Sequence, residues 1–528
     1  MKNFLQQIFR LYETVKHLRG RQIFFRFIKP FRKRWSIYQA TKIKLRIPDQ
    51  SETLILQSIL PSPVSLRGNK FSFLNLEKEF ADGNINWKFQ DNGLLWNYHL
   101  NYFDFLNQEN LPVEDGITLI HHFIDNTDFR SHSYDPYPAS LRGINWIKFL
   151  IKNTIEEAKI DESLFRQYVK LSKETEYHLG ANHILENGFS LLFAAFYFHD
   201  EKFFQLAENI LMKELQEQIL PDGAHFELST MYHRIILHHT LDCVNMMMNK
   251  RTENDMLQNL LSDKASAMLS WMNQMTFSNN EMPDLNDSAN NIALSPDELN
   301  TYAQKLSIFT DKIPLSVSGY RKISFPKYEI IVDAGNVMPP YNPGHSHSDM
   351  LSFCININNK PVIVDCGTST YDNNQRRRFE RSTSAHNTVL INGLEQSDMW
   401  SSFRVGRRAR VIEISSTENS FSSVVNGFTA TGILHKRMWL FQQEKIIITD
   451  LIHGKREIAS KAFLHFHPEV EIKCTETKIM SDSFEIIFKN HHTLSINEYD
   501  FAEGFNRLRK AQVAVIVFSN NLETEFIV

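Results

Sequence analysis

The chain has 528 residues, of which 42% are hydrophobic and 22% charged, which is typical of a folded globular protein with two or three domains. Its 19 Gly and 17 Pro exclude a collagen-like or low-complexity protein. The four cysteines fit neither a zinc motif nor a disulfide framework, so we expect free thiols in a reducing compartment. They are Cys243, Cys354, Cys366 and Cys474.

The first 50 residues are strongly basic. They hold 13 Lys and Arg against Glu13 and Asp49, which is a net charge of +11; because the whole chain carries −4, the remainder carries −15. Such a segment suggests contact with a nucleic acid or an anionic membrane. No nucleic-acid-binding motif accompanies it, and we favour a solvated basic segment on an early helix. Helical spacing relates Phe4, Ile8, Leu11, Val15 and Leu18, and aromatic residues are interleaved at Phe24, Phe25, Phe27, Phe31 and Trp35.

No stretch of the sequence is long and apolar enough to span a bilayer. The opening residues MKNFLQQIFRLYETVKHLRGRQ show neither an uninterrupted apolar core nor a small-residue cleavage site. A secretory signal is therefore not visible, and we expect a cytoplasmic rather than a periplasmic protein.

Between residues 95 and 310 the apolar residues recur at helical spacing. Helices are predicted over 138–153, 162–178, 182–198, 201–219, 229–249 and 254–275. Short connections such as LPDGAH favour antiparallel pairs stacked into an α-helical toroid or solenoid.

Two aromatic segments lie in this helical part, LLWNYHLNYFDFL (94–106) and YDPYPASLRGINWIKFL (134–150). Their aromatic rings can stack on sugars, and Arg142 can bind a carboxylate or sulfate through two hydrogen bonds. The alternative is ordinary helix packing with one surface ion pair. The aromatic residues concerned are Trp96, Tyr98, Tyr102, Tyr137 and Trp146.

Two further polar clusters stand at predicted helix starts. In GANHILENG (180–188), Asn182 and His183 begin a helical run, where Asn commonly acts as an N-cap. In LPDGAHFELSTMYHRIILHH (220–239), Tyr232 follows a cap at Ser229 or Thr230 and so lies in the first turn. Helix ends that face a cleft are common positions for catalytic groups.

From about residue 315 the pattern changes to alternating strands bounded by Gly, Asn, Asp and Ser turns. Many strands with few helices predict an antiparallel β-sandwich. The expected fold is a multidomain α + β protein, with an N-terminal (α/α) toroid of helical hairpins before a C-terminal β-sandwich. The expected domains are a basic segment over 1–85, a helical domain over 86–314 and a sandwich over 315–528.

The strand region carries a histidine cluster in GHSHSDMLSF (344–353). In an extended segment His345 and His347 would leave the same face. His347, with Asp365 in VIVDCGT and His386 in STSAHNTV, predicts a two-histidine, one-carboxylate site suited to Zn²⁺ or a similar divalent ion. The alternative is hydrogen-bonded core histidines.

Taken in this order, the clusters resemble the heparinase II/III family of polysaccharide lyases, from about residue 90 onward. NHILENG, LPDGAHFELSTMYH, GHSHSDMLSF, VIVDCGTSTY and RSTSAHNTVLING carry the resemblance. The family fold is an (α/α) toroid followed by an antiparallel β-sandwich, which agrees with the order of predicted elements.

The resemblance implies β-elimination at a uronic acid within an acidic polysaccharide. It implies that Asn182 and His183 neutralise the carboxylate, and that Tyr232 and His345 supply the base and the acid. Which of the two does which depends on the epimer of the uronate. It also places a structural metal on His347, Asp365 and His386, and suggests substrate contacts at Glu186, Tyr371, Arg381 and Arg142.

Three other functions stay open at this stage. A uronate C5-epimerase would need much the same residues, because it shares the first proton abstraction. A non-catalytic polysaccharide-binding protein would have no need of the acid–base set. A metallohydrolase would use the histidines to hold zinc-activated water. The identity of the uronate, the need for sulfate and the oligomeric state do not follow from the sequence.

Overall fold

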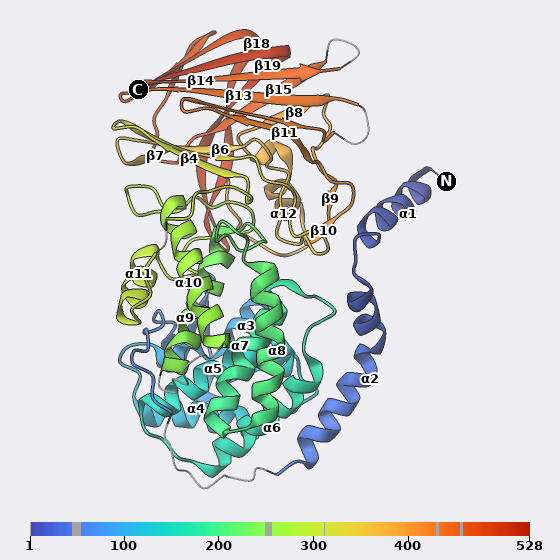
Figure 1. The fold of residues 1–528 in the computed structure, drawn as a ribbon, viewed down its shortest axis with the longest axis vertical. Coiled ribbons are helices and arrows are strands. Elements are labelled where there is room, and N and C mark those ends of the chain that lie inside the picture. The colour runs from blue at the N-terminus through green and yellow to red at the C-terminus, as the bar shows by residue number, and fades with distance from the viewer. Residues whose placement is uncertain (1, 45–53, 249–255, 311, 429–431, 455–457) are drawn as a thin grey trace.

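The computed structural model describes residues 2–44, 54–248, 256–310, 312–428, 432–454 and 458–528. A mainly helical part comes first and a part built mainly of strands second, and the two are stacked end to end (Figure 1). This order confirms the predicted fold class. The division at residues 85 and 314 stays a prediction.

The helical part contains most of the helices. They are α1 (Lys2–Val15), α2 (Gly20–Lys42), α3 (Leu94–Tyr102), α4 (Val113–Asn126), α5 (Pro136–Lys152), α6 (Ala158–Glu174), α7 (Ala181–Phe198), α8 (Glu201–Gln218), α9 (Thr230–Met247), α10 (Met256–Met275) and α11 (Pro296–Lys305). The six predicted helices correspond to α5 to α10. None of the helices among the described residues meets the length and hydropathy that a membrane crossing requires.

Helix α7 is the central helix of this part. Almost every residue from Ala181 to Phe198 is buried, as expected for a helix that is apolar all round. A side chain at Gly188 would lie 2.9 Å from both Ile210 and Leu211 of α8, so glycine is what allows the two helices to approach. The first turn of α7 is thereby fixed against its neighbours.

A small sheet precedes the helical bundle. It consists of β1 (Leu66–Arg67), β2 (Lys70–Phe73) and β3 (Leu76–Glu79) in antiparallel order. Our sequence analysis did not predict it, because these strands are short and separated by turn residues. Phe71 and Phe73 pack into the core of the helical part.

Two antiparallel sheets form the strand part. One has the order β4-β5-β6-β7, and the other the order β11-β12-β13-β14-β19-β18-β17-β16, with β15 pairing β19 and β8. The smaller sheet consists of β4 (Tyr320–Ser324), β5 (Tyr328–Asp333), β6 (Phe353–Ile357) and β7 (Lys360–Ile363).

The larger sheet consists of β8 (Val389–Ile391), β11 (Val411–Ser416), β12 (Ser420–Val425), β13 (Leu434–Gln442), β14 (Lys445–His453), β15 (Ala459–His465), β16 (Lys473–Cys474), β17 (Lys478–Met480), β18 (Glu485–Gly504) and β19 (Arg507–Ile527). Separate short elements are β9 (Met399–Trp400), β10 (Arg404–Val405) and α12 (Gln375–Glu380). Side chains of both sheets share one core, including Ile330, Phe353, Trp439 and Phe518, as in a β-sandwich.

The junction between the two parts is built from buried polar and apolar contacts. The carboxylate of Asp222 accepts hydrogen bonds from the backbone of Ser316 (3.0 Å) and Ser318 (2.9 Å), and the Tyr320 hydroxyl donates to the Leu228 carbonyl (2.9 Å). Trp271 of α10 packs in the same cluster as Tyr320. These contacts hold the loop before α9 against the first strand of the sandwich.

Candidate active site

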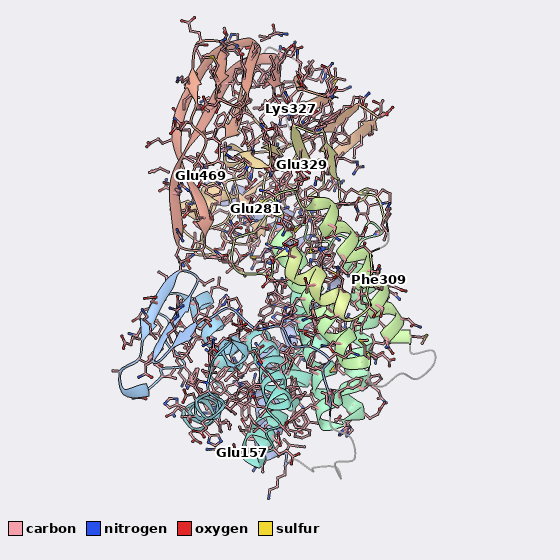
Figure 2. All side chains as sticks on the ribbon, turned by 90° about the vertical axis from the view of Figure 1, so that its left-hand side faces the viewer. Glu157, Glu281, Phe309, Lys327, Glu329 and Glu469 are labelled. Carbon is pink, nitrogen blue, oxygen red and sulfur yellow. The ribbon has the colours of Figure 1, made fainter. Side chains whose placement is uncertain are left out.

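A cavity of about 1780 Å³ lies at this junction and is lined by side chains of both parts. Glu281 from the helical part and Glu469 from the strand part both line it, and they lie where the two parts meet (Figure 2). Asn182, His183, Tyr232 and His345 also line it. The four residues expected to be catalytic are therefore brought to one cavity from three separate segments.

The start of α7 presents Asn182 and His183 to this cavity. Gly180 has a positive φ of 69° and ends the preceding loop as the N-cap, so Asn182 lies inside the helix and is not its cap. Its backbone N–H donates to Glu227 (3.2 Å) and its side-chain amide donates to the same carboxyl group (3.3 Å). The side-chain oxygen of Asn182 is buried without a hydrogen-bond partner in the described part of the chain.

His183 lies next to a carboxylate. Its Nδ1 is 3.3 Å from Glu176, and its ring packs against Tyr137 with centroids 4.7 Å apart. Burial lowers the pKa of His183, but the carboxylates of Glu176 and Glu227 outweigh it, so the pKa lies above its ordinary value. The neighbouring carboxylates therefore favour the charged form of His183 on this wall of the cavity.

The start of α9 positions Tyr232. Ser229 is the N-cap and accepts a hydrogen bond from the Tyr232 backbone N–H at 3.1 Å, which confirms the predicted first-turn position. The Tyr232 hydroxyl lies 3.3 Å from the Tyr371 hydroxyl, and its ring packs against that of His345, tilted by 37° with centroids 4.1 Å apart. Burial raises the pKa of Tyr232, so the phenol is protonated at neutral pH.

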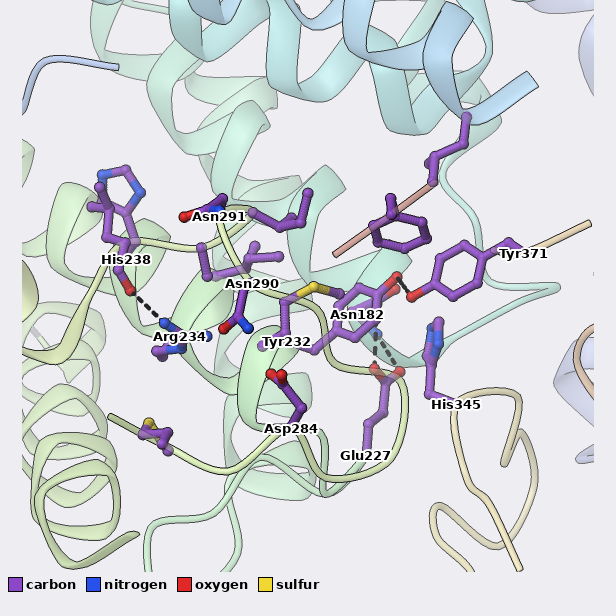
Figure 3. Close-up of a pocket in the computed structure, with 18 of the residues that line it drawn as sticks. Asn182, Glu227, Tyr232, Arg234, His238, Asp284, Asn290, Asn291, His345 and Tyr371 are labelled. Carbon is purple, nitrogen blue, oxygen red and sulfur yellow. Dashed lines mark hydrogen bonds between the residues drawn. The ribbon is translucent and has the colours of Figure 1, made fainter. Parts of the chain in front are cut away.

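His345 comes from the loop between β5 and β6. This segment is not the extended one in which His345 and His347 would leave the same face, because β6 begins only at Phe353. The loop folds so that His345 and His347 both reach Asp287: Nδ1 of His345 lies 2.8 Å from one carboxylate oxygen and Nε2 of His347 lies 2.9 Å from the other. Figure 3 shows His345 close to Tyr232 and Tyr371.

Asp287 is the residue that our sequence analysis missed. It is fully buried, and besides the two histidines it binds both terminal nitrogens of Arg377, one of them at 2.7 Å. Burial would raise the pKa of Asp287, but Arg377 and the histidines hold it well below its ordinary range. An ionised Asp287 assigns the proton of His345 to Nδ1, which leaves Nε2 free to accept a proton.

Glu227 is the second missed residue. It lies two residues before the cap of α9, lines the cavity and holds Asn182. Burial raises the pKa of Glu227 above its ordinary value. The motif LPDGAHFELSTMYH contained it, but only the fold shows that its partner lies on α7.

The three predicted metal ligands lie together and are fully buried. His386 Nδ1 is 2.7 Å from Asp365, and the rings of His347 and His386 have centroids 5.3 Å apart. Nδ1 of His347 and Nε2 of His386 have no hydrogen-bond partner among the described residues. Buried imidazole nitrogens without partners are what a metal ion would satisfy. The types of donor therefore suit a divalent ion, although the ligand atoms of the three residues do not all lie within 4.8 Å of one another.

A second group of possible metal ligands, unlike the first, has all its ligand atoms close to one another. Among the described residues, His238, His239 and Asp242 place one ligand atom each within 4.8 Å of one another. Lys148 already lies 2.5 Å from Asp242, and Glu186 lies 2.7 Å from His239. Because the Lys148 ammonium group neutralises Asp242, we interpret this group as an ion-pair network beside the cavity, although Nε2 of His238 has no hydrogen-bond partner among the described residues.

Two of the predicted substrate contacts, Tyr137 and Tyr371, line the cavity, as do Tyr98 and Tyr102. Trp146 does not line it, nor do four other predicted contacts, and for these five the expectation of substrate contact does not hold. Trp96 is fully buried and packs on Phe73 and Phe89, and Trp146 is fully buried as well. Glu186 is buried behind His239. Arg381 is buried and donates to the backbone carbonyls of Ser346 and Ser402.

Arg142 is the fifth. It is fully buried and donates to Gln167 (2.8 Å) and to the carbonyls of Asn101 (3.1 Å) and Ser133 (2.7 Å). Burial lowers the pKa of Arg142 to about 10. It ties α3 and the segment before α5 to α5 and α6, and it is not available to a carboxylate in the cavity.

We therefore expect Arg142→Ala to act on stability. Because the change leaves buried carbonyls unpaired and opens a cavity, the free energy of unfolding should fall by about 3 kcal/mol or more. Denaturant unfolding measures this loss. A variant of unchanged stability but weakened substrate binding would restore Arg142 as a substrate contact.

Two protein-family models match the chain. The heparinase II/III N-terminus matches residues 158–315, and the heparinase II/III-like C-terminal region matches residues 310–526. The chain belongs to the heparinase II/III family. Together the two models span residues 158–526 of this heparinase II/III-like chain, which include Asn182, His183, Tyr232 and His345.

Solved structures agree on the fold. A crystal structure of heparinase III matches with a TM-score of 0.70 at 15% identity, covering 96% of this chain and 91% of that one. The heparan sulfate lyase HepC from Pedobacter heparinus matches with a TM-score of 0.57 at 13% identity, covering 94% of this chain and 87% of that one. No curated protein sequence shows significant similarity to this chain. At such identities the structures establish the toroid and sandwich alone.

Proposed function

We propose that this chain is a polysaccharide lyase that cleaves a uronic-acid-containing polysaccharide by β-elimination. The observation that carries the proposal is the close packing of Tyr232 against His345 in a cavity that Asn182 and His183 also line. A hydroxyl, an oriented imidazole and two carboxylate-binding groups are the set that elimination at a uronate requires.

The reaction needs a neutralised carboxylate first. Asn182 and the positively charged His183 bind the uronate carboxylate, so that the proton on C5 becomes acidic enough to leave. Glu227 holds Asn182 in place by accepting hydrogen bonds from its backbone N–H and its side-chain amide. The start of α7 thus binds the carboxylate of the substrate.

Tyr232 and His345 supply the base and the acid. One takes the proton from C5, the electron pair forms the C4–C5 double bond, the C4–O4 bond breaks, and the other protonates O4. Asp287 keeps Nε2 of His345 free for this exchange and stabilises the ring when it becomes charged. The epimer of the uronate decides which residue acts first.

The charge of the cavity points to a substrate with little or no sulfate. Nine Asp and Glu line it against six Lys and Arg. Five of those six cations already bind protein oxygens: Arg26, Lys148, Arg234, Arg507 and Arg509. Few cations are therefore left to bind sulfate groups, whereas a polymer with one carboxylate per repeat needs only Asn182 and His183.

Ultraviolet absorbance during incubation with a panel of polymers tests the function. The panel holds hyaluronan, unsulfated chondroitin, alginate, bacterial capsular polymers and heparan sulfate. The conjugated double bond absorbs where the substrate does not, and we expect the fastest rise on an unsulfated polymer. A flat trace on every polymer, together with deuterium uptake at C5 from heavy water, would replace the lyase by an epimerase.

We further propose that His347, Asp365 and His386 hold a structural divalent ion, with zinc the best fit to two imidazoles and a carboxylate. Besides the two unpartnered ring nitrogens, the surroundings support a cation. Asp333 and Asp349 are buried close to Asp365 and His386, and burial raises the pKa of Asp349 to about 6. Such an ion would tie β7 and β8 to the loop that carries His345.

His347→Ala is expected to lower metal content and thermal stability together. The purified protein is analysed for metals and its melting temperature is followed with and without chelator. We expect the wild type to lose several degrees on chelation and the variant to lose nothing further. Unchanged metal content in the variant would refute this ligand set.

A further inference from the structure

The two N-terminal helices turn their apolar faces outward. Among the described residues, 24 large hydrophobic side chains are exposed, and 11 of them belong to α1 and α2. Phe27 is 77% exposed, Phe31 72% and Trp35 56%. The full set is Ile8, Phe9, Leu11, Tyr12, Val15, Ile23, Phe24, Phe27, Phe31, Trp35 and Tyr38. A helix on a globular protein normally does the reverse and buries this face.

The polar faces of both helices bind the body of the protein. On α1, Arg10 binds Asp398 (2.7 Å) and the Thr14 hydroxyl accepts from Trp400 (3.1 Å). Next to α2, Arg19 binds Glu217 (2.6 Å), and Arg32 of α2 donates to the Thr175 carbonyl (3.1 Å). Gln22, Ser36 and Ala40 are the buried positions of α2.

The exposed positions of α2 form a single stripe. Residues 23, 24, 27, 31, 35 and 38 fall within an arc of about 120° at 3.6 residues per turn, and the buried positions 22, 36 and 40 lie opposite. The side chains of Arg34 and Lys42 project from the same arc and are exposed. The outer surface therefore combines aromatic rings with positive charge.

Both helices run along one side of the molecule, from beside β9 and β10 to the far end of the helical part (Figure 1). The apolar ridge is therefore long, and larger than the scattered apolar side chains a protein normally leaves in water. Phe, Trp and Tyr beside Lys and Arg are the residues that lie at the boundary of headgroups and acyl chains. The net charge of +11 over residues 1–50 suits an anionic surface, and the −15 of the remainder points the body away from it.

We propose that α1 and α2 bind the surface of an anionic lipid bilayer, with the stripe from Ile23 to Tyr38 inserted among the headgroups. Arg26 of α2 also lines the cavity, so one helix joins the bilayer-facing surface to the substrate site. Bound in this way, the protein presents its cavity to polysaccharide held close to a membrane. The binding itself does not depend on the proposed lyase activity.

Flotation of the full chain with vesicles tests this binding. We expect the protein to float with mixed phosphatidylglycerol and phosphatidylcholine vesicles, and to remain behind with phosphatidylcholine alone. The variant Phe27→Ser, Phe31→Ser, Trp35→Ser should bind about tenfold more weakly or worse, because three inserted rings are lost. The matched control is Ile412→Ser, Ile414→Ser, Leu440→Ser, which removes three exposed apolar side chains of the sandwich and should bind as the wild type does.

A second variant and a fluorescence signal test the same binding, so the proposal can still be judged if the triple variant does not fold. Arg34→Glu with Lys42→Glu changes only exposed charges and should also weaken binding to anionic vesicles by about tenfold. Trp35 is the most exposed tryptophan, so its fluorescence should shift to shorter wavelength with anionic vesicles and not in Trp35→Phe. Equal recovery with both vesicle types, or no binding, would overturn the proposal. So would a wild type that is dimeric in solution and becomes monomeric in the triple variant, since a second copy would then cover the stripe.

Discussion

Tyr232→Phe should abolish most turnover while leaving the fold intact. The change removes one hydroxyl, whose only partner among the described residues is the Tyr371 hydroxyl at 3.3 Å. A group that transfers a proton to or from the reacting centre contributes about 10²- to 10⁴-fold to the rate, so kcat should fall by that factor. Stability should change by about 1 kcal/mol or less.

Tyr98→Phe is the matched control. Tyr98 also lines the cavity, and its hydroxyl donates to Asp135 at 3.3 Å, but it is not stacked on His345. Initial rates, oligosaccharide binding and melting temperature are compared for both variants. If Tyr232→Phe kept a rate close to that of Tyr98→Phe, Tyr232 would be a wall of the cavity and not its acid or base.

Asp287→Asn should reduce both activity and stability. The amide keeps the shape of the carboxylate but removes the charge that Arg377 and two histidines share. Leaving a buried guanidinium without its counter-charge costs about 3–5 kcal/mol. The rate per folded molecule should also fall by about 10²-fold or more, because His345 loses the group that fixes its tautomer.

Asp450→Asn is a matched control that separates the loss of activity in Asp287→Asn from its loss of stability. Asp450 is buried in the sandwich and, like Asp287, binds a histidine and an arginine, with His435 at 2.6 Å and Arg437 at 2.7 Å. It lies outside the cavity lining. Asp450→Asn should lose comparable stability and keep its kcat. Equal loss of kcat in both variants, measured on the folded fraction, would reduce Asp287 to a structural role.

Local patterns were sufficient to predict most of the fold. The spacing of apolar residues places α5 to α10 within a few residues of their observed ends. Each of these helices is buried either along one continuous face or all round. The lengths of β18 and β19 did not follow from the sequence. These strands have 20 and 21 residues, and polar residues such as His491, Thr493 and Asn497 interrupt the apolar alternation that marks a strand.

The sequence predicted only those parts of the site that a local signal marks. Tyr232 was placed by its cap, which is a local signal. Asp287 and Arg377 were not predicted, because their roles depend on contacts between residues far apart in the sequence. His345 lies 58 residues from Asp287, and Arg377 lies 90 residues from it. Trp96 and Arg142 show the opposite error, since an aromatic or a cation in a helix looks the same in sequence whether it faces a cavity or the core.

The measurement that tests the central claim most directly is the chemistry of the new non-reducing end. The wild type is incubated in heavy-oxygen water with the polymer it cleaves fastest, and the products are weighed by mass spectrometry. Elimination predicts ends that carry a C4–C5 double bond and no oxygen from the water. Saturated non-reducing ends, which keep the bridging O4 while the water oxygen joins C1 of the other product, would show hydrolysis and contradict the assignment of Tyr232 and His345 as the acid–base pair of a lyase.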